Sequence, residues 1–186
     1  MRHSNQLRII AGRWRGRKLG FPNIAGLRPT SDRVRETLFN WLQALVPGSS
    51  CLDLFAGSGA LGFEAASRGA ADVIMVERSA LAVGSLRENV ARLEADNIIV
   101  TREDALTFLQ GPPKARDLVF LDPPFESAII ETCCLLLENH GWLATEAFVY
   151  LEMDRDAPMP RVPSTWRLYR QGKAGRVAFL LMRRSS

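Results

Sequence analysis

The stretch from Cys51 to Gly62, CLDLFAGSGALG, limits the possible folds most strongly. An apolar run stops at a glycine-rich turn, and a second apolar run follows it. This pattern predicts a strand, a tight turn and a helix. Gly57 and Gly59 have no β-carbon, so the backbone can take unusual dihedral angles there and a ligand can approach it closely. Since the start of a helix also presents free N–H groups, a nucleotide-like ligand fits this turn.

Two classes of cofactor are compatible with the turn. Gly57, Gly59 and Gly62 match the G-x-G-x-x-G pattern of dinucleotide-binding proteins, and Glu77 follows Gly57 by twenty residues. Asp53 favours another ligand, because a carboxylate in a buried parallel strand needs a cation or hydrogen-bond donors. S-adenosylmethionine carries an α-ammonium group that meets this need, whereas NAD offers no cation at that position. A simpler alternative is that Asp53 only caps the turn.

Beyond this unit the sequence alternates between strands and helices. The pattern predicts strands at residues 73–77, 98–101, 118–121 and 148–151, and helices at 80–93, after Asp104 and at 128–139. Residues 166–170 and 177–182 predict a terminal hairpin. Continuous apolar strands that alternate with helices are typical of an α/β protein with a mostly parallel sheet and helices on both faces.

A second motif, Asp122-Pro123-Pro124-Phe125, follows the predicted strand at 118–121. Two consecutive prolines stiffen the backbone and remove two N–H donors, so the motif presents mainly oxygen acceptors. Such acceptors suit the exocyclic amino group of a base, and Phe125 offers a face on which the ring can stack. If both N–H groups are held, the nitrogen lone pair can point at the methyl group of a sulfonium donor. The alternative is a rigid loop without a chemical role.

Four acids end or closely follow predicted strands: Asp53, Glu77, Asp104 and Asp122. Ligands of such sheets bind at the carboxyl ends of the strands, so we expect these acids to lie at one edge. For S-adenosylmethionine, Asp53 would lie near the methionine part, Glu77 would accept from the ribose hydroxyls and Asp104 from the adenine amino group. Each acid could instead cap a helix.

Basic residues concentrate at the start of the chain. Residues 1–35 hold nine Lys and Arg and one acid, whereas the other 151 residues sum to a net charge of −4. This excess suits a polyanion such as nucleic acid. Leu7, Trp14, Leu19 and Phe21 lie between the arginines and predict short strands with a turn. We therefore expect an ordered flap that faces RNA, and the alternative is a solvated basic arm.

The remaining sequence features exclude several classes of protein. No apolar run is long enough to span a membrane and no secretory signal follows Met1, so we expect a soluble, cytoplasmic protein. Cys51, Cys133 and Cys134 lack metal-ligand spacing and predict buried, reduced thiols. The two histidines are isolated, and no metal site is expected. Residues 28–45 predict an amphipathic helix that begins near Ser31.

These motifs resemble the class I S-adenosylmethionine-dependent methyltransferases that modify amino nitrogens. The resemblance lies in D-x-F-A-G-S-G-x-L-G-x-E-A at residues 53–65, in Glu77 and in DPPF at 122–125. A closer resemblance, to the bacterial small-subunit ribosomal RNA guanine-N2 methyltransferases of the RsmD type, lies in R-I-I-A-G-x-x-R-G-R-x-L at 8–19 and R-P-T-x-D-R-V-R-E-T-L-F-N-W-L at 28–42.

The resemblance implies a Rossmann-like fold with a seven-stranded sheet whose last strand is antiparallel. It also implies S-adenosylmethionine as methyl donor, S-adenosylhomocysteine as product, and one guanine of 16S rRNA as substrate, in an assembled or partly assembled small subunit. Thr30, Arg33 and nearby residues would form a lid over the cofactor and substrate. A monomer is expected.

We therefore expect an N-terminal basic extension at residues 1–27 and a methyltransferase domain at 28–186. The expected catalytic residues are Asp122, Pro123, Pro124 and Phe125. The expected cofactor-binding residues are Thr30, Asp53, Phe55, Ala56, Gly57, Ser58, Gly59, Glu77, Asp104 and Ala105. Those expected to bind RNA are Arg13, Arg15, Arg17, Lys18, Arg28 and Arg33.

Three other functions remain open at this point. A methyltransferase could act on another amino nitrogen, either adenine N6 in nucleic acid or a protein glutamine. The glycine motif would also suit an NAD-linked oxidoreductase, although Asp53 speaks against it. A non-catalytic RNA-binding factor would need no intact DPPF motif.

Overall fold

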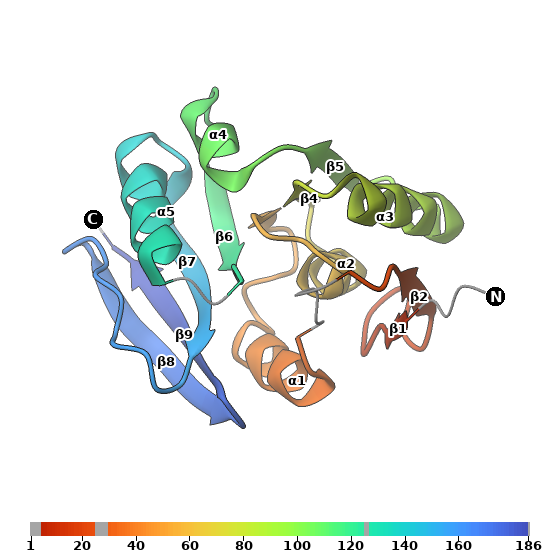
Figure 1. Ribbon diagram of the computed structural model, residues 1–186, viewed down its shortest axis with the longest axis horizontal. Helices are drawn as coiled ribbons and strands as arrows, with labels where there is room; N and C mark the ends of the chain where they lie inside the picture. The colour runs from red at the N-terminus through yellow and green to blue at the C-terminus, as the bar shows by residue number, and fades with distance from the viewer. Residues whose placement is uncertain (1–4, 25–29, 125–126, 186) are drawn as a thin grey trace.

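The structure is a computed structural model that describes residues 5–24, 30–124 and 127–185. Its strands are β1 (Asn5–Arg8), β2 (Lys18–Phe21), β3 (Ser50–Asp53), β4 (Asp72–Glu77), β5 (Ile98–Arg102), β6 (Arg116–Leu121), β7 (Leu143–Asp154), β8 (Trp166–Ala174) and β9 (Val177–Arg184). Its helices are α1 (Asp32–Trp41), α2 (Ala60–Ser67), α3 (Ala80–Leu93), α4 (Ala105–Gln110) and α5 (Ser127–Asn139). Strands and helices alternate from β3 to β7, as the sequence predicts (Figure 1).

The central sheet has seven strands in the order β5-β4-β3-β6-β7-β9-β8. Strands β3 to β7 are parallel to one another, whereas β9 runs antiparallel to both β7 and β8. The predicted α/β class is therefore confirmed, and so is the antiparallel last strand that the family resemblance implies. Consecutive strands move outward from β3 in both directions, so the strand order reverses between β3 and β6, where ligands of open α/β sheets bind.

Strands β7 and β8 exceed their predicted lengths the most. The apolar run at 148–151 marks only part of β7, which continues to Asp154 because it pairs with β9 over residues 148–154. Strand β8 likewise continues past Arg170 through residues 171–174, which pair with β9. Backbone pairing needs no apolar side chains, so hydrophobic patterning does not mark these strand ends.

Helices cover both faces of the sheet, as expected for parallel strands. On one face α1, α2 and α3 pack against side chains such as Met75 and Phe120. On the other face α4 and α5 enclose a second cluster that contains Val119 and Leu137. Helix α1 begins where predicted, since the Ser31 hydroxyl accepts a hydrogen bond from the Val34 N–H at 3.3 Å.

The N-terminal segment forms the predicted short strands and turn. Strands β1 and β2 pair antiparallel, and Leu7, Leu19 and Phe21 are buried in the same core cluster as α2 and α3. We call residues 5–21 the flap. Figure 1 shows it beside α2 and α3, at the opposite end of the molecule from β8 and β9. The expected boundary at residues 27 and 28 lies outside the described residues.

Buried polar contacts join the flap to α2. Glu64, with no exposed surface, accepts from the N–H groups of Ile10 at 2.9 Å and Ala11 at 3.0 Å, and from the Arg68 side chain at 2.7 Å. Arg35, also buried, approaches the same carboxylate at 3.5 Å. A single acid on α2 therefore holds the flap and α1 together.

The three cysteines are free and buried, as predicted. Burial is the main cause that raises the pKa of the Cys51 and Cys133 thiols to about 12, so both are protonated at neutral pH. Within the described residues, no group of three or more His, Cys, Asp or Glu could hold a metal ion. No helix in this part of the chain is long and apolar enough to cross a membrane.

Two glycines of the flap offer a matched test of its packing. Gly12 and Gly16 both have left-handed backbone angles, with φ of 83° and 81°. A β-carbon at Gly12 would lie 1.9 Å from the Ser67 carbonyl oxygen, whereas one at Gly16 would meet no atom within 4 Å. Both positions carry the same backbone strain, but only Gly12 touches α2.

We predict that Gly16→Ala lowers the free energy of unfolding by about 1–2 kcal/mol, the cost of a left-handed alanine. Gly12→Ala should cost about 1–3 kcal/mol more, because the flap must move away from α2. Urea unfolding followed by circular dichroism measures both values. Equal losses in the two variants would contradict the close contact.

Candidate active site

The carboxyl ends of four adjacent strands bring the predicted acids to one edge of the sheet. Asp53 ends β3, Glu77 ends β4, Asp104 follows β5 and Asp122 follows β6. The negative charge of Glu77 acts on Asp53, and that of Asp53 acts on Asp122. The expectation that these acids share an edge is therefore confirmed, although their roles toward a ligand are a separate question.

The glycine turn between β3 and α2 has the backbone that its sequence predicts. Gly57 and Gly59 have φ values of 51° and 82°, in the left-handed region that favours glycine. The Gly57 N–H donates to one oxygen of Glu77 at 3.0 Å, and the Ser79 N–H donates to the other at 2.7 Å. Glu77 thus ties the turn to the loop after β4. Of the other predicted residues in this turn, Phe55 is half-buried, and Ala56 and Ser58 are buried.

Asp53 caps α2 from the neighbouring strand. Its side chain is almost fully buried, and its Oδ2 atom accepts from the Gly62 N–H at 3.0 Å. The helix begins after Gly59, which has no capping side chain of its own. This oxygen of Asp53 therefore serves as a cap, and a role of Asp53 toward a ligand stays a prediction. Burial raises the pKa of Asp53 to about 7, helped by the charge of Glu77 and opposed by the bond from Gly62.

Asp104 also acts as a helix cap. Its Oδ1 atom accepts from the N–H groups of Leu106 at 3.0 Å and Thr107 at 3.4 Å, at the start of α4. The side chain is exposed, and the following residue, Ala105, is buried. Asp104 is therefore open to a further partner through its second oxygen.

The DPPF motif leaves β6 at the point where the strand order reverses. Asp122 is half-buried and its Oδ2 atom accepts from the Thr30 hydroxyl at 3.1 Å. Burial and the nearby Glu152 raise the pKa of Asp122 well above its usual value. Pro123 is buried and Pro124 exposed, whereas Phe125 lies outside the described residues. Thr30, which was expected at the cofactor, thus contacts a residue expected to be catalytic.

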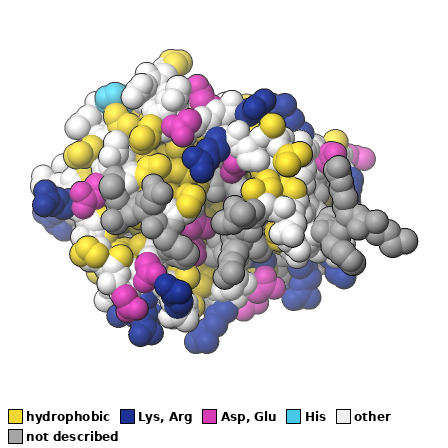
Figure 2. All heavy atoms as spheres, in the orientation of Figure 1, with side chains coloured by type: hydrophobic (Ala, Val, Ile, Leu, Met, Phe, Trp, Pro, Cys, Tyr) yellow, Lys and Arg dark blue, Asp and Glu magenta, His cyan; other side chains and the backbone are white. Residues whose placement is uncertain are grey.

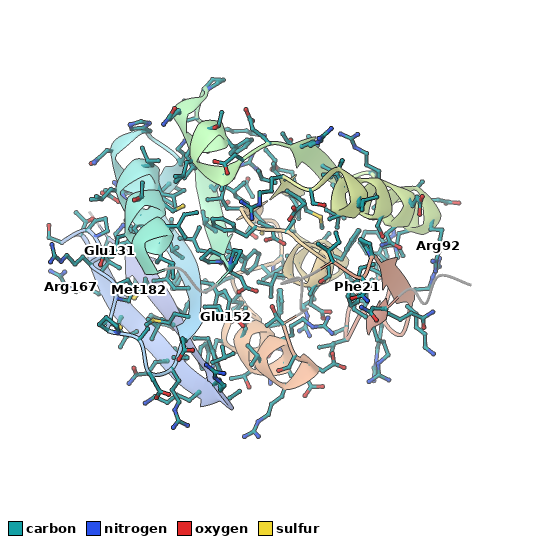
Figure 3. The ribbon with its side chains drawn as sticks, in the orientation of Figure 1. Phe21, Arg92, Glu131, Glu152, Arg167 and Met182 are labelled. Carbon is teal, nitrogen blue, oxygen red and sulfur yellow. The ribbon has the colours of Figure 1, made fainter. Side chains whose placement is uncertain are left out.

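The sequence patterns did not indicate two members of this cluster, Tyr150 and Glu152. Both are buried on β7, and the Tyr150 hydroxyl donates to Glu152 Oε2 at 2.8 Å. Figure 3 labels Glu152 where β7 passes α1. The rule that found the other acids would have found this one, because Glu152 directly follows the predicted strand at 148–151.

The predicted RNA-binding residues lie on two elements. Arg13, Arg15, Arg17 and Lys18 are exposed on the flap, and Arg33 is exposed on α1. Figure 2 shows Lys and Arg side chains at the lower right, where the flap lies. Arg28 lies outside the described residues.

Two arginine side chains, one from the flap and one from α3, also hold these two elements together. The Arg17 guanidinium donates to the Arg92 carbonyl at 3.0 Å, and the Arg92 guanidinium donates to the Lys18 carbonyl at 2.9 Å. Figure 3 labels Arg92 at the end of α3 that faces Phe21 of β2.

Comparison with known proteins places these features in a family. The family model "Conserved hypothetical protein 95" matches residues 7–183. Ribosomal RNA small subunit methyltransferase D of Escherichia coli K12 is 48% identical over 98% of this chain and 92% of its own length. The Haemophilus influenzae protein of the same name is 43% identical over 95% of this chain and 93% of its own.

Solved structures agree with this relationship. A putative methyltransferase, yhhF of Escherichia coli, superposes with a TM-score of 0.92 at 44% identity and covers 98% of this chain and 99% of its own. A putative methylase of Haemophilus influenzae, HI0767, gives a TM-score of 0.83 at 39% identity and covers 98% of this chain and 100% of its own.

The family and fold imply a methyl donor of the S-adenosylmethionine type. Both the sequence match and the superposition extend over nearly the whole chain, so they include the flap as well as the sheet. The chain therefore belongs to the Conserved hypothetical protein 95 family, that of the RsmD-type ribosomal RNA small subunit methyltransferases.

Proposed function

We propose that the protein transfers a methyl group from S-adenosylmethionine to the N2 amino group of a guanine in 16S rRNA. The observation that carries this proposal is the position of Asp122 and its two prolines, at the same sheet edge as Asp53 and the glycine turn. The names of the relatives support small-subunit ribosomal RNA as the substrate. The choice of guanine N2 rests on the family resemblance.

The acceptor groups at the glycine turn fit S-adenosylmethionine. Asp53 is a buried carboxyl without an ion-pair partner among the described residues, so the α-ammonium group of the cofactor would offset its cost of burial. Each Glu77 oxygen accepts one backbone N–H and has a second lone pair for a ribose hydroxyl. Asp104 would accept from adenine, and Thr30, Phe55, Ala56, Gly57, Ser58, Gly59 and Ala105 would complete the site.

The DPPF motif would orient the amino group. When bound, the cofactor supplies a methyl group on a positively charged sulfur. Asp122 and the Pro123 carbonyl would accept the two N–H bonds of guanine N2 and turn its lone pair toward that methyl group. Methylation would displace one proton from the nitrogen, and Asp122 would accept it. Phe125 would stack on the base, flipped from its surroundings.

The flap would bind the RNA backbone. Arg13, Arg15, Arg17 and Lys18 expose their side chains on it, and Arg28 and Arg33 would extend this surface toward the first helix. Phosphate contacts of this kind hold the substrate without reading its sequence. An assembled or partly assembled small subunit is the proposed substrate particle, and a monomer acting in the cytoplasm is the proposed working form.

A nucleoside analysis tests the reaction. Labelled S-adenosylmethionine and small-subunit particles from cells without the gene should yield N2-methylguanosine after digestion. Asp122→Ala should lower the transfer rate by on the order of 100-fold, because the amino group loses its orientation. The matched control, Glu146→Ala, removes an exposed acid near the start of β7, away from the carboxyl ends of the strands, and should keep the rate. Methylated adenosine or a methylated protein would identify one of the other amino-nitrogen targets.

Cofactor binding should depend on pH through Asp53. Its pKa of about 7 means that the α-ammonium group must pair with a carboxyl that is partly protonated at neutral pH. Pairing favours the ionised form, so S-adenosylhomocysteine should bind more tightly as the pH rises from about 6 to 8 and should release a proton. Calorimetry in two buffers of different ionisation enthalpy measures this release, and Asp53→Asn should abolish it. Tight binding of NAD with no response to S-adenosylhomocysteine would instead favour the oxidoreductase.

The salt dependence of RNA binding should depend on the positive charge of the flap. Within the described residues, the side chains of Arg15 and Lys18 form no hydrogen bond or ion pair, so they are the flap cations freest to meet phosphates. The double variant Arg15→Gln, Lys18→Gln should reduce the slope of log affinity against log salt by about 2, close to one per phosphate contact. Lys173→Gln, on β8 at the other end of the molecule, is the control. An unchanged slope in the double variant would contradict the RNA-facing flap.

A further inference from the structure

The end of the chain holds a second concentration of basic residues. Residues 161–186 contain seven Lys and Arg and no Asp or Glu. Three of these cations pair with acids of other elements: Arg176, Arg183 and Arg184. The others are exposed and form no ion pair within the described residues: Arg161, Arg167, Arg170 and Lys173. Because most of this second group lies on β8, the edge strand carries positive charge that the protein does not neutralise.

Backbone pairing shows on which face of the sheet these cations lie, since partners on adjacent strands point to the same side. Arg170 pairs with Leu181, which belongs to the core cluster under α1, α2 and α3. Lys173 pairs with Ala178, which belongs to the cluster under α4 and α5. Arg170 and Lys173 therefore lie on opposite faces of the same strand.

Arg167 lies on the face that α1 covers. Its partner across the hairpin, Arg183, pairs in turn with Phe148 of β7, which packs against the core cluster under α1. The Arg167 guanidinium donates to the carbonyl oxygens of Ser164 and Trp166, which carry no formal charge. Its own charge thus stays available at the edge of the molecule, where Figure 3 labels it beside β8.

A bulge in β8 brings an aromatic ring to the same face. The register against β9 shifts between Leu168 and Arg170, so Tyr169 is the extra residue. Successive residues of a strand normally point to opposite faces, but the bulge leaves Tyr169 and Arg170 on one face. The Tyr169 ring makes a T-shaped contact with Phe148, with centroids 5.3 Å apart, and the Arg170 guanidinium lies over it at 5.4 Å from its centroid. Since Tyr169 is 46% exposed, this stacked pair faces the solvent.

A groove between α1 and β8 borders the stacked pair. It is lined by Trp41 of α1 and by residues 168–171 of β8. Trp41 stacks on Phe179 of β9, with ring centroids 5.4 Å apart. The Phe179 ring lies against the backbone of β8, where a β-carbon at Gly172 would come within 2.3 Å of it. Packing therefore fixes the wall of the groove before any ligand binds.

We propose that this groove, with Tyr169, Arg167 and Arg170, is a second contact surface for the ribosomal RNA of the substrate particle and takes an unpaired nucleotide. This inference rests on the proposed function. Bases stack on aromatic rings and on guanidinium planes alike, so an unpaired base can extend the stack of Arg170 on Tyr169. The two arginines suit the adjacent phosphates, and the stacked ring favours a planar base over an acidic peptide.

The position of the groove suits a large substrate. The flap packs into the same core cluster as α1, so both basic surfaces lie on one side of the sheet. They lie at opposite ends of the molecule (Figure 1), with the glycine turn and the DPPF motif at the middle strands between them. A ribosomal particle is wide enough to meet both ends at once.

Affinity for small-subunit particles from cells without the gene tests this surface. Tyr169→Ala should weaken binding by on the order of 10-fold, because the base loses its platform, and Tyr169→Phe, which keeps the ring, should bind like the wild type. The double variant Arg167→Gln, Arg170→Gln should lower the slope of log affinity against log salt by about 1 to 2. Lys173→Gln, on the other face of the same strand, is the matched control and should leave the slope unchanged.

The outcomes distinguish this inference from the proposed function. Circular dichroism, binding of S-adenosylhomocysteine and the transfer rate at saturating particle should be unchanged in every variant. Wild-type affinity in Tyr169→Ala together with a wild-type slope in the double variant would overturn the second surface. Ultraviolet crosslinking of the wild-type protein should join Tyr169 to a nucleotide, and a crosslink to a ribosomal protein instead would also overturn it. A wild-type protein that binds particles but forms no N2-methylguanosine would overturn the proposed function itself.

Discussion

The buried carboxylate of Glu64 joins the flap, α1 and α2, which are separate segments of the sequence. It accepts from two backbone N–H groups of the flap and is neutralised by Arg68 and Arg35. Arg35 in turn donates to the Arg8 carbonyl. A buried acid without such partners would be costly, so separating the flap or α1 from α2 would destabilise the protein. Since α2 follows the glycine turn directly, the basic flap and the proposed cofactor site belong to one rigid unit.

The acids at the sheet edge show that capping and ligand binding are compatible. Asp53 and Asp104 each satisfy helix N–H groups in the structure. These bonds fix the carboxyl groups in place before any ligand arrives, which is what a preorganised site requires. These two acids thus lie where the folded chain needs acceptors in any case. A capping bond is therefore no evidence against a role in binding.

Sequence patterns alone predict most of this fold. Apolar strands and amphipathic helices have periods that can be read directly, and from β3 to β6 the observed strands and helices agree with them closely. The ends of β7 and β8 depend on pairing with β9, which leaves no hydrophobic signal. The common edge of the four acids could be predicted, because the carboxyl ends of parallel strands lie together. The bond between Thr30 and Asp122 joins residues 92 positions apart, and only folded coordinates can reveal it.

Two arginine side chains hold the flap on α3 through hydrogen bonds that do not neutralise their positive charge. Arg17 and Arg92 both donate to carbonyl oxygens, which carry no formal charge. Each guanidinium therefore fastens the flap and still contributes a full positive charge to the outer surface. Dissolved ions screen attraction between charges over long distances, but they have much less effect on a short bond to a neutral oxygen. In concentrated salt the flap should release a bound polyanion while it stays closed on the body of the protein.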